Sequence, residues 1–360
     1  MGVLGKALPG CCILRNFLET KIMSIISKQK PKEKNAGGAY SFLLSLLLVF
    51  MFSGQSVKAQ PVAPKSSEKS FINITYKKNI ADSALTLDIF LPDSGATKKY
   101  PVVIIIHGGG WVLGDKTLET IYYMQCLKTE LLANRFAVIS INYSLVGENI
   151  HLPAPVEDCK DAIRWVRAHA NDYNLDTLNI GLWGGSAGGH LALLAAYTTN
   201  EQFPGDKELA SHSARVNYVI DNFGPTELNS LFRMDAGCFS TFLVKVFIRK
   251  LNDIREKLVF AMTGFHIKKD KQKIKEINAR NSPLGYISVN AVPTIIFHGD
   301  NDKVVPISQS RTLKQDLDKY SIKNEMIIVN KGDHGFNNIP NDEIDKLVAQ
   351  SISFIKAQLR

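Results

Sequence analysis

The most constraining feature of this sequence is residues 184–190, Gly-Gly-Ser-Ala-Gly-Gly-His, because of what flanks them. The apolar run 178–183 before them has the composition of a buried strand, and residues 191–196 after them that of a helix. Ser186 has a glycine two positions away on each side, and glycine allows a turn tight enough to project a hydroxyl. The chain therefore needs a strand, a sharp turn and a helix in immediate succession. Gly and Ser are also ordinary turn residues, so the pattern needs support from other segments.

Strand-like and helical patterns alternate through most of the chain, and 45% of its 360 residues are hydrophobic. The expected strands are 71–76, 85–91, 102–106, 136–142, 178–183, 216–222, 294–297 and 326–329. The expected helices are 118–134, 156–171, 191–198, 308–320 and 342–359. The first two strands lie close together and predict an antiparallel start. The alternation that follows predicts the α/β class, with a mostly parallel sheet covered by helices on both faces.

One interval, about 225–290, interrupts this alternation. It contains no obvious core strand, and its mixed apolar and charged stretches at 242–251, 254–262 and 268–277 are helical in pattern. We interpret it as a small helical lid inserted over the site. The alternative is a long crossover connection without a role in substrate binding.

The N-terminal residues have the layout of an export signal. Residues 39–57 carry no charge, a lysine-rich stretch precedes them, and the small residue Ala59 ends them. We expect residues 1–59 to be a signal peptide with a possible true start at Met23, residues 60–70 to be a linker, and residues 71–360 to form one domain. The alternative for the first segment is an uncleaved membrane anchor. After cleavage we expect no stable membrane anchoring, and a secreted or periplasmic protein.

The net charge of +9 is concentrated in that N-terminal segment. Eight Lys/Arg and two Asp/Glu fall in residues 1–59, so residues 60–360 hold 35 basic and 32 acidic residues, a net charge of +3. The densest later basic run, 268–275, has little aromatic interleaving and is typical of a solvated helix face. We therefore expect no nucleic-acid partner.

The cysteines and histidines indicate neither a disulfide framework nor a metal site. Three cysteines, Cys126, Cys159 and Cys238, follow residue 59, none in a C-x-x-C spacing, and their odd number leaves at least one thiol unpaired in a monomer. The histidines outside the motifs show no metal-type clustering. No metal and no cofactor is expected.

Three further segments share with Ser186 a position just after an expected strand. They are 107–111 (His-Gly-Gly-Gly-Trp), 298–306 (His-Gly-Asp-Asn-Asp-Lys-Val-Val-Pro) and 332–336 (Gly-Asp-His-Gly-Phe). In open α/β sheets, ligands bind beyond the carboxyl ends of the strands. The four segments are therefore expected to meet at one edge of the sheet.

In this order the four segments resemble those of α/β-hydrolases, specifically the hormone-sensitive-lipase-type and feruloyl-esterase-like (BD-FAE-like) carboxylesterases, over residues 71–360. The resemblance implies that Ser186 is a nucleophile, His334 its general base and Asp302 the acid that orients His334. Asp302 matches the family position three residues before Val305-Pro306. Asp300, two residues nearer the strand, is the rival and is expected to cap the loop. The chain order Ser, Asp, His is that of this fold.

The resemblance also assigns residues 107–111 to an oxyanion hole, with the amides of Gly109, Gly110 and Ala187 as donors. The alternative is an ordinary glycine-rich turn or a phosphate cradle, but no G-K-S/T or G-x-G-x-x-G completes a nucleotide motif. Trp111 is assigned to substrate binding, since it either lines the acyl or alcohol pocket or packs beneath the lid.

Together these features predict a secreted serine carboxylesterase that hydrolyses short acyl esters through an acyl-enzyme. Acetyl or feruloyl groups on carbohydrate are the favoured substrates, although fold and triad do not fix a substrate. The alternatives are a lipase-like esterase for longer acyl chains, a prolyl-oligopeptidase-like peptidase and a non-catalytic ligand-binding protein. The forty-seven residues between Ala59 and His107 are too few for the N-terminal propeller of such peptidases. The oligomeric state is left open.

Overall fold

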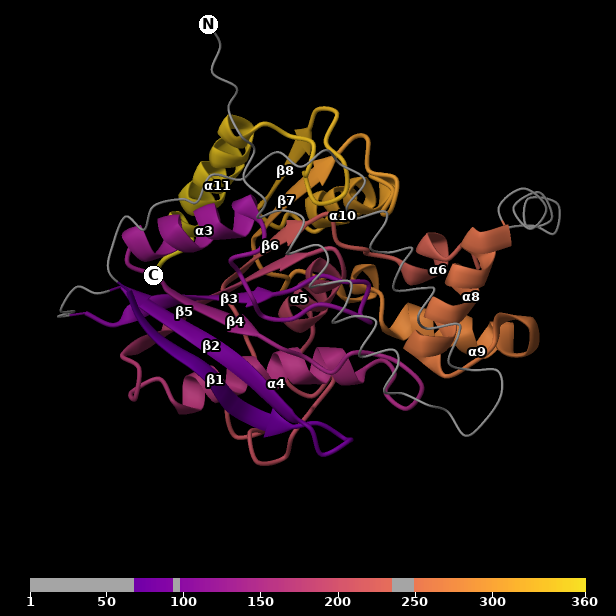
Figure 1. Ribbon diagram of the computed structural model, residues 1–360, viewed down its shortest axis with the longest axis horizontal. Helices are drawn as coiled ribbons and strands as arrows, with labels where there is room; N and C mark the ends of the chain where they lie inside the picture. The colour runs from indigo at the N-terminus through magenta and orange to yellow at the C-terminus, as the bar shows by residue number, and fades with distance from the viewer. Residues whose placement is uncertain (1–67, 93–97, 235–248) are drawn as a thin grey trace, which may run out of the picture. The chain divides into compact units, whose positions relative to one another are not determined.

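The computed structural model describes residues 68–92, 98–234 and 249–360, and its centre is one twisted sheet (Figure 1). Eight strands of the described chain pair in the order β1-β2-β4-β3-β5-β6-β7-β8. Their bounds are β1 Glu68–Lys78, β2 Ala84–Pro92, β3 Tyr100–Ile106, β4 Ala137–Ile141, β5 Leu175–Gly185, β6 Tyr218–Asn222, β7 Thr294–Gly299 and β8 Asn324–Val329. β2 is antiparallel to both β1 and β4, and every later pair is parallel. The α/β fold and its antiparallel start are therefore as predicted.

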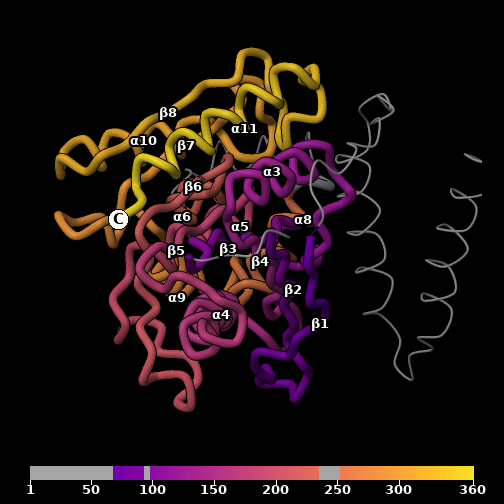
Figure 2. The backbone as a smooth tube through the Cα atoms, turned by 90° about the vertical axis from the view of Figure 1, so that its left-hand side faces the viewer, coloured from indigo at the N-terminus to yellow at the C-terminus, as the bar shows by residue number. Residues whose placement is uncertain are grey.

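Helices cover both faces of the sheet, because alternate side chains of its buried strands are apolar on each side. One face packs against α3 (Tyr122–Ala133) and α11 (Asn341–Lys356), which lie side by side in Figure 2. The other face packs against α4 (Ala154–Ala168), α5 (Ala187–Tyr197) and α10 (Ser308–Lys319). The fully buried β3 side chains contribute to both cores, because this strand is apolar on both of its faces.

The interval between β6 and β7 is helical where it is described. It contains α6 (Leu228–Leu231), α8 (Arg249–Thr263), α9 (Ile267–Arg280) and the 3₁₀ turn η1 (Pro283–Tyr286). The three α-helices lie together to the right of the sheet in Figure 1. Lys268–Lys275 falls on α9, whose exposed face carries the basic residues while Ile274 is buried. Whether this insertion acts as a lid stays a prediction.

The start of the first strand differs from the sequence expectation. β1 begins at Glu68, so the last three residues of the expected linker, 68–70, belong to a strand. This beginning is mostly exposed and polar, because β1 is an edge strand, and it therefore lacks the apolar signal of a buried strand. The expected signal peptide and its start at Met23 lie outside the described residues. In the part of the chain that is described, no helix combines the length and apolarity needed to cross a bilayer.

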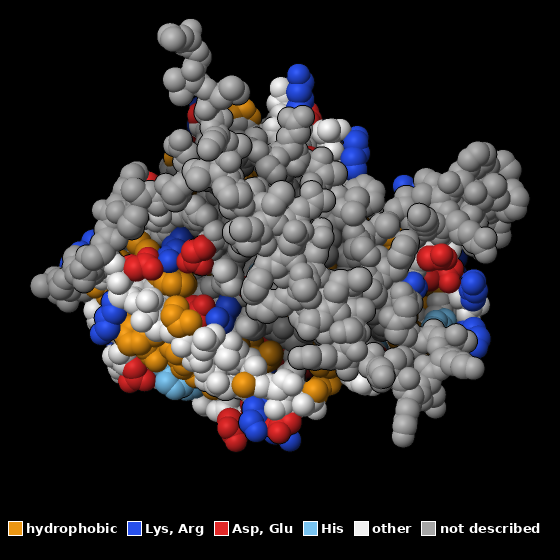
Figure 3. Space-filling model, in the orientation of Figure 1, with side chains coloured by type: hydrophobic (Ala, Val, Ile, Leu, Met, Phe, Trp, Pro, Cys, Tyr) orange, Lys and Arg blue, Asp and Glu red, His pale blue; other side chains and the backbone are white. Residues whose placement is uncertain are grey.

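Acidic and basic side chains are interspersed on the described part of the face in Figure 3. This mixture agrees with the nearly balanced charge counted for residues 60–360.

Candidate active site

The sheet order brings the four sequence motifs to one edge. β3, β5, β6, β7 and β8 are consecutive parallel neighbours, so their carboxyl ends share an edge of the sheet. The loops after β3, β5, β7 and β8 carry the motifs, and the loop after β6 lies between them. Motifs separated by more than two hundred residues are thereby neighbours in space.

Ser186 occupies a sharp turn between β5 and α5. Its φ of +56° lies in the left-handed region, which a side chain rarely adopts. Two close approaches hold the turn and require glycine: a Cβ on Gly184 would lie 2.2 Å from the Gly188 carbonyl oxygen, and one on Gly188 would lie 2.1 Å from that of Ile106. The Ser186 amide donates to the Asn222 carbonyl at 2.8 Å. The half-buried hydroxyl is thus fixed above the sheet edge.

Ser186, His334 and Asp302 form a continuous hydrogen-bonded series. His334 Nε2 lies 2.9 Å from Ser186 Oγ, and His334 Nδ1 lies 2.7 Å from Asp302 Oδ2. Because a carboxylate only accepts, Nδ1 carries the proton and Nε2 is free to accept from the serine hydroxyl. The aromatic ring of Phe223 packs beside the imidazole, with ring centroids 4.7 Å apart. This is the geometry in which a histidine can take a proton from serine.

Asp302 is held as an anion by four donors. Oδ1 accepts from the amides of Val304 and Val305 at 2.8 and 2.9 Å. Oδ2 accepts from His334 and lies 3.3 Å from Nε2 of the buried His298. Burial alone would raise the pKa of Asp302, but the hydrogen bonds from the two histidines and the Val304 amide outweigh it and hold the pKa well below its ordinary value. The carboxylate therefore stays ionised beside His334.

The structure separates the two rival acids. Asp300 Oδ1 accepts from the Lys331 amide at 2.6 Å and joins the loops after β7 and β8. Asp302 is the carboxylate that meets His334. Asp300 therefore has a loop-bracing position.

The glycine-rich loop after β3 lies directly against the serine turn. A Cβ on Gly108 would lie 2.9 Å from the Gly185 carbonyl oxygen and 3.4 Å from Ser186 Cβ. Gly109 and Gly110 have φ angles of +109° and +61°, a conformation that glycine adopts without strain. Tyr143 steadies the start of the loop, since its hydroxyl donates to the His107 carbonyl at 3.0 Å. Its ring also stacks on the His107 imidazole, with centroids 4.3 Å apart.

The three amides expected in the oxyanion hole are available as donors. Within the described residues, the N–H groups of Gly109, Gly110 and Ala187 donate no hydrogen bond to the protein. Ala187 is the first residue of α5, where amides have no intrahelical partner. Unused donors next to Ser186 suit an oxygen that gains negative charge.

Trp111 does not line an open pocket in this conformation. Only 3% of its surface is exposed, and its indole Nε1 donates to His190 Nδ1 at 3.1 Å. Of its two sequence interpretations, the structure therefore favours packing over the assigned contact with substrate. The physical reason is that the indole packs against His190 of α5.

Sequence reasoning gave no role to two further buried groups at this edge, His298 and Asp221. Asp221 lies on β6, and its Oδ1 accepts from the Gly224 amide at 3.0 Å. Burial raises the pKa of Asp221 to about 7, although His298 and the Gly224 amide act to lower it. A charged residue in the apolar strand 216–222 was the available signal.

The remaining sequence candidates do not gather into a second site. Cys126 and Cys159 are buried and unpaired, while Cys238 lies outside the described residues. In the described ranges, no three His, Cys, Asp or Glu side chains are placed to hold a metal ion.

Comparison with known proteins connects this geometry to a family. The BD-FAE family model matches residues 87–317, which include Ser186 and Asp302 and end before His334. Esterase LipC of Mycobacterium tuberculosis is 27% identical over 66% of this chain and 53% of its own length. The probable carboxylic ester hydrolase LipM of the same organism is 30% identical over 65% of this chain and 49% of its own. The chain thus spans about half the length of these curated relatives.

Among solved structures, a truncated form of a carbohydrate esterase from gut microbiota is similar over nearly its whole length. It superposes with a TM-score of 0.63 at 25% identity, covering 82% of this chain and 99% of its own.

Proposed function

The chain belongs to the BD-FAE family, and we propose on that premise that it is a serine carboxylesterase acting through Ser186, His334 and Asp302. The observation that carries the proposal is the hydrogen-bonded series from Asp302 through His334 to Ser186, at 2.7 and 2.9 Å, beside three unused amides. The printed names of the curated relatives, an esterase and a carboxylic ester hydrolase, support the same reaction class.

In the acylation step, Ser186 Oγ attacks the ester carbonyl carbon while His334 Nε2 takes the hydroxyl proton. The carbonyl oxygen becomes an oxyanion, which accepts hydrogen bonds from the amides of Gly109, Gly110 and Ala187. Collapse of this intermediate breaks the bond to the alkoxy oxygen, and His334 returns the proton to the leaving alcohol. Asp302 stays ionised throughout and stabilises the imidazolium.

Deacylation repeats these steps with water. His334 takes a proton from water, the hydroxide attacks the acyl carbon, and Ser186 Oγ leaves with the proton that His334 returns. The acid is released and the serine is regenerated.

For the substrate, we propose short acyl esters of carbohydrate, with acetyl or feruloyl groups as the acyl part. The similarity to a carbohydrate esterase of gut microbiota supports this choice. A site of this kind attacks any ester that fits, so chain length and alcohol must be measured.

We also propose that the protein is exported and loses residues 1–59. Sequencing of the N-terminus of the exported protein is expected to begin at Gln60, and retention of earlier residues would contradict cleavage.

The function is tested with p-nitrophenyl acetate, butyrate and octanoate, and with acetylated and feruloylated xylan fragments. Wild-type turnover is expected to be highest on the shorter esters. Ser186→Ala is expected to lose on the order of 10⁴-fold or more in kcat, because the nucleophile is gone. A folded wild-type chain without activity on any of these esters would overturn the proposal. Preference for octanoate would instead indicate the lipase-like alternative.

A further inference from the structure

Trp111 ends an unusual stretch of backbone. Its φ is +63°, and it follows Gly109 and Gly110, whose φ angles are also positive. Glycine adopts this region freely, but a tryptophan there is strained and persists only when its surroundings fix it. The two residues before it carry the amides proposed for the oxyanion hole. Whatever fixes Trp111 therefore also sets the direction of those amides.

Three contacts fix Trp111. Its indole Nε1 donates to His190 Nδ1 at 3.1 Å, and the two rings meet edge to face with centroids 5.2 Å apart. Its carbonyl accepts from the Val146 amide at 2.9 Å. The indole is buried, so water does not compete for its N–H.

The direction of the hydrogen bonds around His190 follows from chemistry alone. His190 Nε2 lies 2.6 Å from the Asn281 carbonyl oxygen, which only accepts, so Nε2 carries the proton. Nδ1 is then left with a lone pair, and the indole N–H, which only donates, points at it. Burial lowers the pKa of His190 to about 4, so the ring is neutral at neutral pH and keeps this acceptor.

The three partners come from three parts of the site. Trp111 follows the glycine-rich loop, His190 lies on α5 one turn after Ser186, and Asn281 follows the last residue of α9 in the insertion. The His190 amide also donates to the Ser186 carbonyl at 3.1 Å. The end of the helical insertion is thereby connected to the glycine-rich loop through the helix that begins at the serine.

We infer that Trp111 and His190 are a positioning pair for the oxyanion hole, with the Asn281 carbonyl selecting the tautomer of His190 that accepts from the indole. Neither side chain touches the substrate. The inference rests on the proposed ester hydrolysis and replaces the substrate-binding role first expected for Trp111.

The test removes single hydrogen bonds while keeping shape. Trp111→Phe keeps an aromatic ring and removes the N–H. His190→Asn keeps an acceptor near the Nδ1 position, and His190→Gln keeps a donor near the Nε2 position. Trp165→Phe is the matched control, because Trp165 is also buried and stacks on a histidine, His169, with centroids 4.1 Å apart, but lies on α4.

On p-nitrophenyl acetate, kcat is expected to fall about 30-fold in Trp111→Phe and His190→Gln, since a misdirected loop weakens oxyanion stabilisation. It is expected to fall only about 3-fold in His190→Asn, which restores the acceptor. KM is expected to change less than about 3-fold in all three, because the ground-state carbonyl makes weaker use of the hole. Trp165→Phe should keep the wild-type kcat within about twofold.

A second readout uses trifluoroacetone. Ser186 Oγ adds to its carbonyl carbon, the hydroxyl proton passes to His334, and the former carbonyl oxygen becomes an oxyanion. Its inhibition constant is expected to rise in proportion to the loss of kcat/KM across the series. Thermal unfolding of each variant shows whether it is folded.

The outcomes separate this inference from the proposed function. An inactive wild-type chain would overturn the function and the inference with it. An active wild type would overturn the inference alone if folded Trp111→Phe and His190→Gln matched Trp165→Phe. Equal losses in His190→Asn and His190→Gln would also contradict it, because the accepting nitrogen would then be irrelevant.

Discussion

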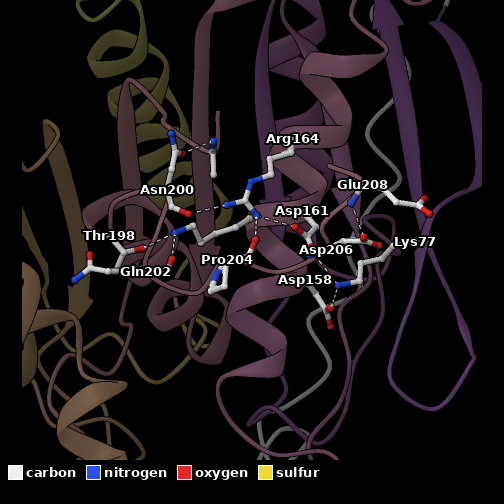
Figure 4. A network of polar contacts seen from close by, with 12 residues as sticks. Lys77, Asp158, Asp161, Arg164, Thr198, Asn200, Gln202, Pro204, Asp206 and Glu208 are labelled. Carbon is white, nitrogen blue, oxygen red and sulfur yellow. Dashed lines mark hydrogen bonds and ion pairs between the residues drawn. The ribbon is translucent and has the colours of Figure 1, made fainter. Parts of the chain in front are cut away.

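Two buried hydrogen-bonded networks in this protein use the same chemistry but end differently. At the active site, Asp302, His334 and Ser186 form a series whose last member is a half-buried hydroxyl. The second network lies along α4 and connects β1 and α4 to the loop after α5 (Figure 4). We call it the α4 network, and its charged members are Lys77, Asp158, Lys160, Asp161 and Arg164. The first network leads to a group that can react, and the second ends on backbone carbonyls and amides.

The α4 network is closed by the protein itself. Asp161 pairs with Lys77 and Arg164, each at 2.7 Å. Arg164 also donates to the carbonyls of Pro204 and Asn200, at 2.7 and 3.1 Å. Each of these charges thus faces an opposite charge or a fixed dipole of the protein.

Lys160 shows why a shifted pKa alone does not identify a catalytic group. Burial, with a contribution from the nearby Arg164 cation, lowers the pKa of Lys160 to about 8, a value that would suit a catalytic base. Its ammonium donates to the Thr198 hydroxyl at 3.2 Å and to the carbonyls of Thr199 and Gln202. Lys160 is fully buried, so no substrate can reach it. Its lowered pKa therefore reflects a structural setting, whereas the lowered pKa of Asp302 reflects its contact with His334 at the candidate active site.

The largest expected effect is a loss of activity in Asp302→Asn. Without the carboxylate, His334 loses the group that fixes its tautomer and stabilises its charge, so kcat is expected to fall about 10³- to 10⁴-fold. Steady-state kinetics on p-nitrophenyl acetate measures this. Asp300→Asn is the matched control and is expected to keep most activity, because Asp300 contacts the Lys331 amide. An equal loss in both variants would mean that the acid has been misassigned.

A substitution in the α4 network is expected to lower stability and to leave activity nearly unchanged. Asp161→Ala leaves Arg164 without its buried carboxylate and Lys77 with Asp158 alone, and breaking such a buried pair is expected to lower the free energy of unfolding by about 3–5 kcal/mol. Denaturant unfolding measures the change, and kcat per folded molecule should stay near that of the wild type.

Lys346→Ala is the control for that experiment. Lys346 and Glu343 pair at 2.6 Å on α11, but their side chains are 62% and 50% exposed. Exposed pairs contribute little, so the unfolding midpoint should not change measurably. A loss of activity in folded Asp161→Ala would show that the closed network also serves the site.

Much of the fold and of the candidate site could be predicted from the sequence. The features that could not be predicted are those that depend on tertiary contacts. All eight strands were predicted, and six of them, β2 to β7, are rich in buried apolar side chains. The four motifs could be placed at one edge because parallel strands share a direction. The partner of Trp111 lies outside any local pattern, because His190 is 79 residues away along the chain.

The acidic residues of α4 also depend on contacts that are distant in sequence. Glu157, Asp158 and Asp161 lie near the start of this helix, where negative charge is favourable for a local reason. In the folded chain, Asp158 and Asp161 instead meet Lys77 of β1. No sequence spacing indicates that contact, because the approach of β1 to α4 is decided by packing on the sheet.

The stability that the α4 network provides is expected to depend on pH through Lys160. Its pKa is about 8 in the fold against an ordinary value of 10.5, so between those values the unfolded chain binds more protons than the native one. The free energy of unfolding of the wild type, relative to Lys160→Met, is therefore expected to rise with pH from about 8 to 10.5, by about 3 kcal/mol in total. Denaturant unfolding at several pH values measures the difference. If the difference in unfolding free energy does not change with pH across this range, the hydrogen bonds to the Lys160 ammonium offset the cost of burying its charge.

The smallest expected effect comes from Tyr143→Phe, which tests whether the active-site series needs rigid surroundings of its own. The change removes only the hydroxyl that donates to the His107 carbonyl and keeps the ring stacked on His107. One neutral hydrogen bond contributes about 1 kcal/mol, so a small decrease in stability is expected. If the loop also shifts, kcat should fall about 3- to 10-fold with KM nearly constant. Kinetics and unfolding on the same preparation separate the two. A loss of stability without a loss of kcat would mean that Trp111 and His190 hold the glycine-rich loop without help from Tyr143.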